Sequence, residues 1–180
     1  MATLYKEDDI PLLKDRVIFF DANILISIYF TISPTDWAQK NYSRVFSKLI
    51  AAENKLTFDV TIVSEVINRA LRMEYKTHLR KNDIKDAEFS YKKFRDSQEG
   101  KSAWVRTNTI IRDTIFPSFA ITGKCWTKAD MNFLLTQQGD FNDQLIADIC
   151  REKRFILLTN DADFKNADLE ILSLNNNFFE

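Results

Sequence analysis

Four acidic residues occupy positions from which they could act together: Asp21, Glu65, Asp143 and Asp161. Asp21 directly follows the apolar run VIFF, and Asp161 closes the stretch FILLTND. Glu65 falls in the first turns of one helical pattern, and Asp143 opens another. Ligand sites of open α/β sheets lie at the carboxyl ends of the strands, so we expect all four side chains at one sheet edge.

Taken alone, two of these acids have ordinary structural explanations. Asp21 would serve as a turn or helix-cap residue, and Glu65 as a surface residue that favours the positive end of a helix dipole. Four carboxylates brought together are different, because like charges raise one another's pKa. Such a cluster implies a bound divalent cation that offsets the negative charge.

The available ligands predict Mg²⁺ or Mn²⁺ at this site. His78 is the only histidine, and it lies in the charged segment MEYKTHLRK, where we expect a solvated helix. Cys125 and Cys150 lack the CxxC spacing of a zinc ribbon. Oxygen-only ligation suits Mg²⁺ or Mn²⁺ better than zinc. The chemistry that most needs this arrangement is phosphodiester hydrolysis, in which the cations activate water and stabilise the leaving oxygen.

Alternating strand and helix patterns predict the elements that position these acids. Short apolar runs predict strands at 16–20, 56–60, 155–158 and 170–174. Helical spacing and capping signals predict helices at 34–53, 61–75, 72–94 in two parts, 103–116, 127–135 and 143–154. This order favours an α/β fold around a parallel sheet.

Several local details of these elements can be checked. Ser33 and Pro34 form a helix-start signal, and Ser97 to Ser102 is the strongest internal loop signal. Phe141, Leu145 and Ile149 recur every four residues, which predicts the buried face of the helix that contains Asp143. Trp104 is expected to point inward from helix 103–116.

The bulk properties indicate one globular domain over residues 1–180. The chain is 45% hydrophobic, has only 3 Gly and 3 Pro, and shows no repeat or low-complexity run. The acidic start MATLYKEDDI does not resemble a secretory signal, and no apolar run reaches membrane length. We therefore expect a soluble cytoplasmic protein with no membrane partner.

Charge is distributed unevenly along the chain, although the net charge is only -1. Residues 69–106 contain 11 Lys or Arg and 6 Asp or Glu, a net charge of +5, and the remainder carries -6. A solvated helical face is the ordinary explanation for such a segment. A surface that binds phosphates beside an acidic centre is the functional one.

Four sequence blocks resemble the PIN-domain family of metal-dependent nucleases. They are FFDANILI at 19–26, SEVINRAL at 64–71, FNDQLIADIC at 141–150 and LLTNDADF at 157–164. Each block alone is weakly specific, but their order, spacing and predicted structural contexts agree with the family over nearly the whole chain. The resemblance implies a three-layer α/β/α sandwich with a central, mostly parallel sheet.

The resemblance also assigns site residues and a function. The family's four acids match Asp21, Glu65, Asp143 and Asp161, which are then the catalytic residues and metal ligands. Asn23 matches a polar position near the first acid, and Thr159 the hydroxyl residue that helps to orient the site. Similar proteins are endoribonucleases that require Mg²⁺ or Mn²⁺, and they are often the toxin of a toxin–antitoxin pair. RNA, a cognate antitoxin and a second copy of the chain are thus the expected partners.

The sequence departs from small toxins of this family in two ways. The 77 residues between Glu65 and Asp143 form a longer segment than expected, which suggests a basic helical insertion at about 72–130. Two spare acids, Asp140 and Asp163, stand beside the matched ones. Asp140 either supports the site from the same helical face or is a solvated turn acid, and Asp163 is expected to be a turn residue.

Other functional classes fit the sequence less well. A PIN-like scaffold that binds RNA or protein without cutting is the main alternative. A dehalogenase-like phosphatase would need Asp-x-Asp after the first strand, where this chain has Asp21-Ala-Asn23. A phosphotransfer receiver would need its acceptor Asp in mid-chain with a later lysine, and no pair at the strand ends supplies that order.

Overall fold

The computed structural model describes residues 2–31 and 35–180. The strands are β1 (Thr3–Tyr5), β2 (Val17–Phe20), β3 (Lys55–Asp59), β4 (Ala120–Thr122), β5 (Ile156–Leu158) and β6 (Glu170–Leu172). The α-helices are α1 (Ala22–Tyr29), α2 (Trp37–Ala51), α3 (Val60–Lys81), α4 (Tyr91–Asp96), α5 (Gln98–Ile110), α6 (Lys128–Leu134) and α7 (Phe141–Lys153). Shorter helical turns are η1 (Glu7–Leu13), η2 (Ile111–Ile115), η3 (Phe116–Ser118), η4 (Ala162–Asn166) and η5 (Asn176–Phe178).

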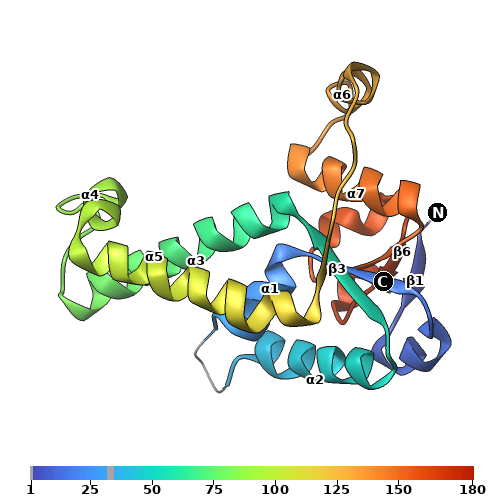
Figure 1. The fold of residues 1–180 in the computed structure, drawn as a ribbon, viewed down its shortest axis with the longest axis horizontal. Helices are drawn as coiled ribbons and strands as arrows, with labels where there is room; N and C mark the ends of the chain where they lie inside the picture. Colours follow the sequence, from blue (N-terminus) through green and yellow to red (C-terminus); the bar gives the residue numbers. More distant parts are fainter. Residues whose placement is uncertain (1, 32–34) are drawn as a thin grey trace.

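The six strands form one sheet in the order β1-β6-β5-β2-β3-β4, and every adjacent pair is parallel. Helix α7 lies on one side of the strands and α2 on the other (Figure 1). The central strands β2 and β5 are almost wholly buried, as expected for apolar strands covered on both faces. The expected α/β sandwich with a parallel central sheet is therefore confirmed.

The register of the central strands brings two predicted site segments together. Phe20 of β2 pairs with Leu158 of β5, and Asp21 N–H donates to the Leu158 carbonyl oxygen at 3.1 Å. Asp21 and Thr159 thus follow paired residues on adjacent strands. Parallel pairing puts both at the carboxyl edge of the sheet, as the sequence predicted.

Capping residues define where the helices near the site begin. Asp59 caps α3 directly after β3, and Asp140 caps α7, so the second helix starts before Asp143. Asp36 caps α2, which begins at Trp37. The predicted start signal at Ser33 and Pro34 lies outside the described residues. Side-chain oxygens at these caps bond otherwise unpaired helix N–H groups.

The predicted loop at 97–102 is wrong, because Ser97 caps α5 and the helix continues through these residues. Gly100 permits the close approach of α5 to α4, since a Cβ there would clash with the Phe94 carbonyl oxygen. The buried face of α5 consists of Gly100, Ala103 and Thr107. Trp104 lies off that face and is 50% exposed, so its predicted inward orientation is also wrong.

The predicted inner face of α7 is only partly correct. Ile149 is buried, but Phe141 is 41% exposed, and Ile146 and Cys150 complete the buried face. The helix begins at the Asp140 cap, so Phe141 is its first residue and lies at its open end. The side chain of Asp143 is half-buried in the first turn of this helix.

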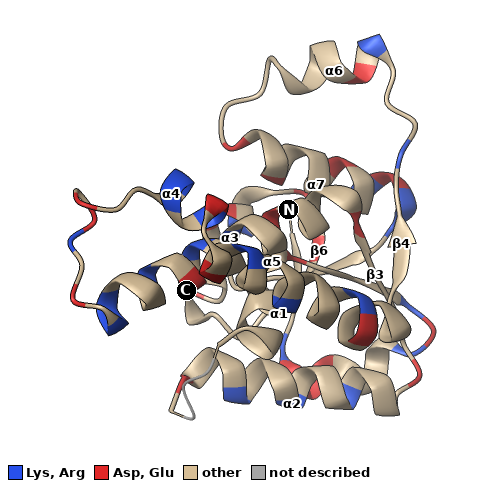
Figure 2. Cartoon of the chain, turned by 60° about the vertical axis from the view of Figure 1, so that its left-hand side comes forward, with Lys and Arg blue, Asp and Glu red and all other residues tan. Residues whose placement is uncertain are grey.

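A helical arm extends sideways from the sheet (Figure 1). We define the arm as residues 69–106, which contain the outer part of α3, α4 and most of α5. Its centre is a separate apolar cluster of Leu71, Tyr75, Leu79, Phe94 and Ala103. Figure 2 shows Lys and Arg along α3 and on α4. The basic segment therefore surrounds an apolar core of its own.

A second projection carries α6 above α7 (Figures 1 and 2). Thr127 and Asp130 form the predicted capping box at the start of α6. Lys124, at the base of the projection, forms ion pairs with Asp130, Asp148 and Glu152 at 3.0, 2.6 and 3.0 Å. This lysine connects the start of the projection to α7.

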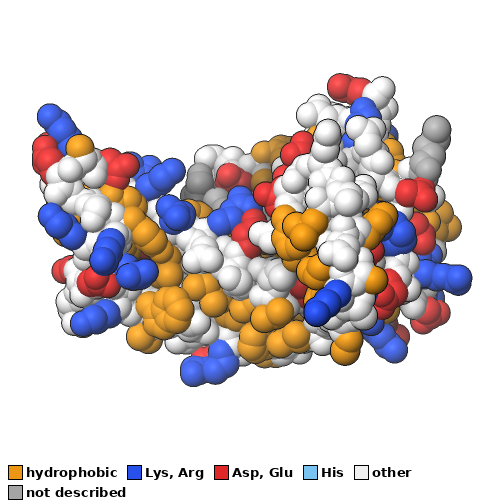
Figure 3. All heavy atoms as spheres, turned by 90° about the horizontal axis from the view of Figure 1, so that it is seen from above, with side chains coloured by type: hydrophobic (Ala, Val, Ile, Leu, Met, Phe, Trp, Pro, Cys, Tyr) orange, Lys and Arg blue, Asp and Glu red, His pale blue; other side chains and the backbone are white. Residues whose placement is uncertain are grey.

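Some large apolar side chains remain exposed, and several gather on the face seen in Figure 3. The exposed residues include Trp104 and Val105 of α5, Ile121 of β4 and Phe133 of α6. Within the described parts of the chain, no helix is both long and apolar enough to cross a membrane.

Candidate functional site

Asp21 is the buried centre of the candidate site. It follows β2, is 6% exposed, and accepts hydrogen bonds on Oδ2 from Thr159 Oγ1 and Asn23 Nδ2, each at 2.6 Å. The pKa of Asp21 is raised to about 6, mainly by burial and also by the nearby charges of Glu65 and Asp161, although the Thr159 hydrogen bond lowers it. This carboxylate is held firmly but carries a charge that its surroundings only partly stabilise.

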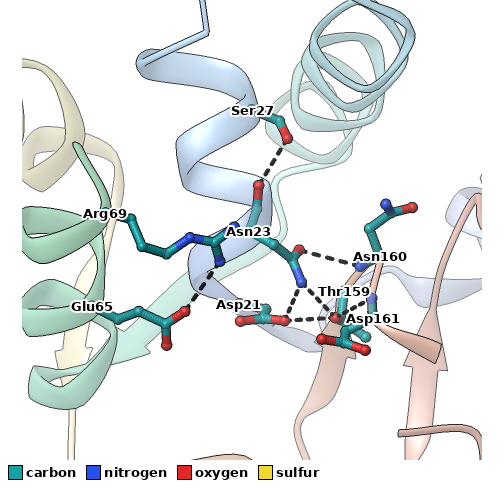
Figure 4. Close-up of polar contacts among 8 residues, drawn as sticks. All are labelled: Asp21, Asn23, Ser27, Glu65, Arg69, Thr159, Asn160 and Asp161. Carbon is teal, nitrogen blue, oxygen red and sulfur yellow. Dashed lines mark hydrogen bonds and ion pairs between the residues drawn. The ribbon is translucent and has the colours of Figure 1, made fainter. Parts of the chain in front are cut away.

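Thr159 and Asn23 form a small network around Asp21 (Figure 4). The Thr159 hydroxyl accepts hydrogen bonds from Asp161 N–H at 3.0 Å and from Asn23 Nδ2 at 3.2 Å. Asn23 Oδ1 accepts from Asn160 N–H at 3.2 Å. The loop after β5 is therefore connected to the start of α1, and two of the predicted supporting residues, Asn23 and Thr159, contact Asp21.

Glu65 lies on α3 and points toward Asp21 (Figure 4). Its Oε1 forms an ion pair with Arg69 Nη1 at 3.1 Å, one helical turn away. Arg69 was not predicted as a site residue, although its position four residues after Glu65 is a recognisable sequence signal. The arginine supplies positive charge at an otherwise acidic edge.

Asp143 is half-buried in the first turn of α7. Burial raises its pKa to about 7, and the charges of Asp140, Asp21, Asp161 and Asp163 contribute in that order. Asp143 also lines a surface cavity of about 810 Å³ between α6, α7 and η4. An ionised Asp143 is therefore unfavourable in the absence of a cation.

The remaining acids have local structural tasks as well. Asp161 is exposed and caps η4, accepting from Asp163 N–H at 3.1 Å. Asp140 caps α7 by accepting from Asn142 N–H at 2.8 Å. The carboxylate of Asp140 is therefore hydrogen-bonded at the start of α7, and its negative charge helps to raise the pKa of Asp143. Asp163 lies in the first turn of η4, a turn position as expected.

The four predicted acids are electrostatically coupled but do not form a closed ligand cage. Besides burial, the charges of Glu65 and Asp161 raise the pKa of Asp21, and the charges of Asp21 and Asp161 raise the pKa of Asp143. Among residues 2–31 and 35–180, no three His, Cys, Asp or Glu side chains lie close enough together to hold one metal ion. The donors are all oxygens with excess negative charge, which fits a hard divalent cation in chemistry. In this arrangement the acids do not converge on one point, and Glu65 forms an ion pair with Arg69 instead.

A further network, missed in the sequence, supports the loop after β5. The buried Tyr42 donates its hydroxyl to Asn160 Oδ1 at 2.8 Å and accepts from Leu174 N–H at 3.3 Å. Asn175 Nδ2 donates to the Asn160 carbonyl oxygen at 2.8 Å. Helix α2 and the C-terminal segment thus position the loop that contains Thr159 and Asp161. No local sequence pattern connects these distant residues.

Comparison with known proteins supports the fold. No protein-family model and no curated protein sequence matches the chain. A solved structure with a similar fold is the crystal structure of VapBC2 from Rickettsia felis bound to a DNA fragment from their promoter. The likeness covers 88% of this chain and 99% of that chain, with a TM-score of 0.52 and 12% sequence identity. At this identity the likeness shows a shared fold.

Proposed function

We propose that this protein is a divalent-metal-dependent endoribonuclease. The observation that carries the proposal is the coupling of the acids at the carboxyl edge of the sheet. There burial, together with the charges of the other carboxylates, raises the pKa of Asp21 to about 6 and that of Asp143 to about 7. Structural acids are usually paired, so mutually destabilised ones indicate a functional site.

In the proposed site, Asp21, Glu65, Asp143 and Asp161 hold Mg²⁺ or Mn²⁺. When bound, the cation supplies an activated water for attack on phosphorus and stabilises the leaving oxygen. Thr159 and Asn23 orient Asp21 through their 2.6 Å hydrogen bonds, as outer partners of a ligand commonly do. Arg69 competes for Glu65, so a cation that recruits Glu65 frees this arginine to meet a phosphate.

The reaction is hydrolysis of a phosphodiester in single-stranded or structured RNA. The oxygen of a water molecule forms a bond to phosphorus while a P–O ester bond breaks. The water gives one proton to solvent, and the leaving oxygen receives a proton from solvent. The carboxylates would act on the reacting phosphate through the cation that they hold, because anionic side chains alone would repel it. The exposed Asp161 and the cavity beside Asp143 leave this edge accessible to a strand of RNA.

Cleavage of labelled single-stranded RNA tests the proposal. Wild-type protein in Mn²⁺ should cut the RNA, excess EDTA should stop cutting, and Asp21→Asn should reduce it to background while the protein stays folded by circular dichroism. Asp15→Asn is the matched control, because Asp15 lies before β2, away from the carboxyl edge, in a left-handed conformation that Asn tolerates. Cleavage that persists in EDTA would overturn the proposal.

We also propose that the protein acts as the toxin of a toxin–antitoxin pair. The sequence blocks that resemble PIN-domain toxins support this proposal, together with the shared fold with VapBC2. Induced expression in a bacterial host should arrest growth, and Asp21→Asn should abolish the arrest. Co-expression of the neighbouring open reading frame should relieve it and yield a co-purifying complex. Growth equal to that of the Asp21→Asn strain would count against a toxin.

A scaffold that binds RNA or protein without cutting is the second candidate. The specific observation in its favour is the ion pair between Glu65 and Arg69, in a site where no three described acidic, His or Cys side chains converge on one ion position. Calorimetric titration separates the two functions. A nuclease should bind Mn²⁺ at Asp21, and a scaffold should show no divalent binding at millimolar metal.

A further inference from the structure

One face of α3 carries a row of cations that begins at the candidate site. Arg69, Arg72, Lys76 and Arg80 follow Glu65 at intervals of three or four residues, the spacing of one helical face. All four are exposed. We call these four residues the cationic ridge. From Arg69 to Arg80 it extends about 16 Å, because an α-helix rises 1.5 Å per residue.

Most of the ridge is not neutralised by carboxylates. Only Arg69, next to Glu65, forms an ion pair; within the described chain Arg72, Lys76 and Arg80 form none. Arg72 lies over the Tyr91 ring at 4.9 Å, and Arg80 donates to Thr77 Oγ1 at 3.3 Å. These three cations keep hydrogen-bonding capacity for an anionic ligand.

The other charged side chains near α3 have different arrangements. Glu74 lies off the ridge and forms an ion pair with Arg106 of α5 at 3.0 Å. At the tip, Lys76 and Arg80 share a cavity of about 520 Å³ with Asp83 and Asp86. The Asp86 carboxylate accepts a hydrogen bond from the Tyr75 hydroxyl, which holds it at the arm's core. At its outer end the cationic ridge therefore lies next to negatively charged side chains.

The ridge is rigid because the arm has its own core. Leu71, Tyr75 and Leu79 occupy the neighbouring face of α3 and pack with Phe94 and Ala103. Figure 3 shows Lys and Arg side chains projecting at the end of the molecule formed by the arm. A rigid row of cations loses less conformational entropy on binding than a flexible basic tail.

We propose that the cationic ridge binds the phosphodiester backbone of a single-stranded RNA outside the bond to be cut. The inference rests on the proposed function, since the ridge starts one turn from Glu65 and extends away from the site. Cations recur about once per helical turn of 5.4 Å, which suits a regularly charged polymer. The half-buried Tyr91 beside Arg72 adds an aromatic surface next to the backbone path.

The test measures RNA binding without cleavage. Asp21→Asn protein in EDTA is titrated with a labelled 20-nucleotide single-stranded RNA, with and without Arg72→Gln, Lys76→Gln and Arg80→Gln together. The control triple is Lys14→Gln, Lys40→Gln and Lys55→Gln, which removes the same charge from exposed positions outside the arm. Thermal unfolding checks that each variant is folded.

The ridge triple should weaken binding at least about tenfold in 50 mM salt and reduce the log–log salt slope by about 2, because each single-strand phosphate contact contributes roughly 0.7. The control triple should change the affinity less than twofold. Equal affinities of the two triples would overturn the proposal, and so would a ridge that binds an acidic protein but not RNA.

Cleavage by the wild-type active site separates this inference from the proposed function. If wild-type protein cuts RNA and the ridge triple binds and cuts normally, the ridge proposal fails and the nuclease proposal stands. If wild-type protein never cuts but the ridge triple loses RNA binding, the nuclease proposal fails and the ridge proposal is supported.

Discussion

The carboxyl edge of the sheet and the helical arm use charge in opposite ways. At the edge, like charges are buried or crowded, and they raise the pKa of Asp21 and Asp143. On the arm, cations are exposed and spaced along α3, and water solvates them. Crowded buried charge reduces stability, whereas exposed separated charge costs little. This difference fits the proposed functions. A cation at the edge would offset the destabilising charge there, whereas the arm can carry a binding surface without that loss of stability.

The two regions also have separate apolar cores, which predicts separate responses to core mutations. Phe94 is 2% exposed and packs against Tyr75, with ring centroids 5.6 Å apart. Phe94→Ala should cost about 3–5 kcal/mol of local stability in the arm, the usual range for a buried Phe. Hydrogen exchange should show lost protection in α4 and α5 while β2 and β5 stay protected.

Phe20→Ala in the main core is the matched control for this mutation. Phe20 is fully buried in β2, so its loss should remove protection from the whole sheet. If Phe94→Ala lowers protection in β2 as much as Phe20→Ala does, the two cores do not respond separately. In that case arm and sheet would unfold as one cooperative unit.

Asp21→Asn should stabilise the metal-free protein at neutral pH. The pKa of Asp21 is raised from 3.8 to about 6, so its ionised form disfavours folding. One pKa unit corresponds to 1.36 kcal/mol, which gives a gain of up to about 3 kcal/mol at pH 8. The stability contributed by protonated Asp21 is complete below about pH 4 and is lost as the pH rises through about 6.

Urea unfolding in EDTA at pH 4 and pH 8 measures this effect. The advantage of Asp21→Asn should be present at pH 8 and absent at pH 4. Millimolar Mn²⁺ should reverse the order at pH 8, because a ligand that binds only the folded wild type stabilises it. A wild type that is already more stable than the variant in EDTA at pH 8 would show that the edge is not destabilised by its charge.

Thr159→Val should weaken Mn²⁺ binding by about 10–100-fold, the usual effect of removing an outer partner of a metal ligand. The hydroxyl holds Asp21 at 2.6 Å and lowers its pKa. Thr159→Ser keeps the hydroxyl and should retain most of the affinity. Calorimetry with Mn²⁺ compares the three proteins, and unchanged binding by the Val variant would remove Thr159 from the site.

The elements that position the site could be predicted because their signals are local. The run VIFF is continuous and apolar, and Thr127 and Asp130 form a capping box within four residues. Strands β1 and β4 were missed, because these three-residue edge strands are exposed or half-buried and do not form an apolar run. The loop predicted at 97–102 failed because Gly100, a loop signal, instead permits close packing of α5 on α4.

The candidate site was predictable in part for the same reason. Asp21 and Thr159 could be placed because each follows an apolar run, and the parallel register then brings them into contact. The capping role of Asp140 required the exact start of α7, and helix starts are uncertain from sequence. The support of Asn160 by Tyr42 joins residues 118 positions apart, a contact that only the tertiary structure creates.

Removing the hydroxyl of Tyr42 should give the smallest effect at the carboxyl edge. Tyr42 is fully buried, and Tyr42→Phe leaves Asn160 Oδ1 and Leu174 N–H without this partner. A lost hydrogen bond of this kind costs about 1 kcal/mol of stability. Asn160 still donates its N–H to Asn23, so the loop should move rather than detach, and RNA cleavage should fall only a few-fold.

Tyr29→Phe is the matched control for this last mutation. Tyr29 packs edge-to-face on Phe46, and in the described chain its hydroxyl has no hydrogen-bond partner. Stability and cleavage should therefore stay at wild-type values in Tyr29→Phe. If Tyr42→Phe lowers stability but leaves both Mn²⁺ affinity and cleavage unchanged, the network beneath Asn160 stabilises the fold without positioning the site. A drop in both would show that α2 and the C-terminal segment set the geometry of the acidic edge, a constraint that the exposed ridge on the arm does not have.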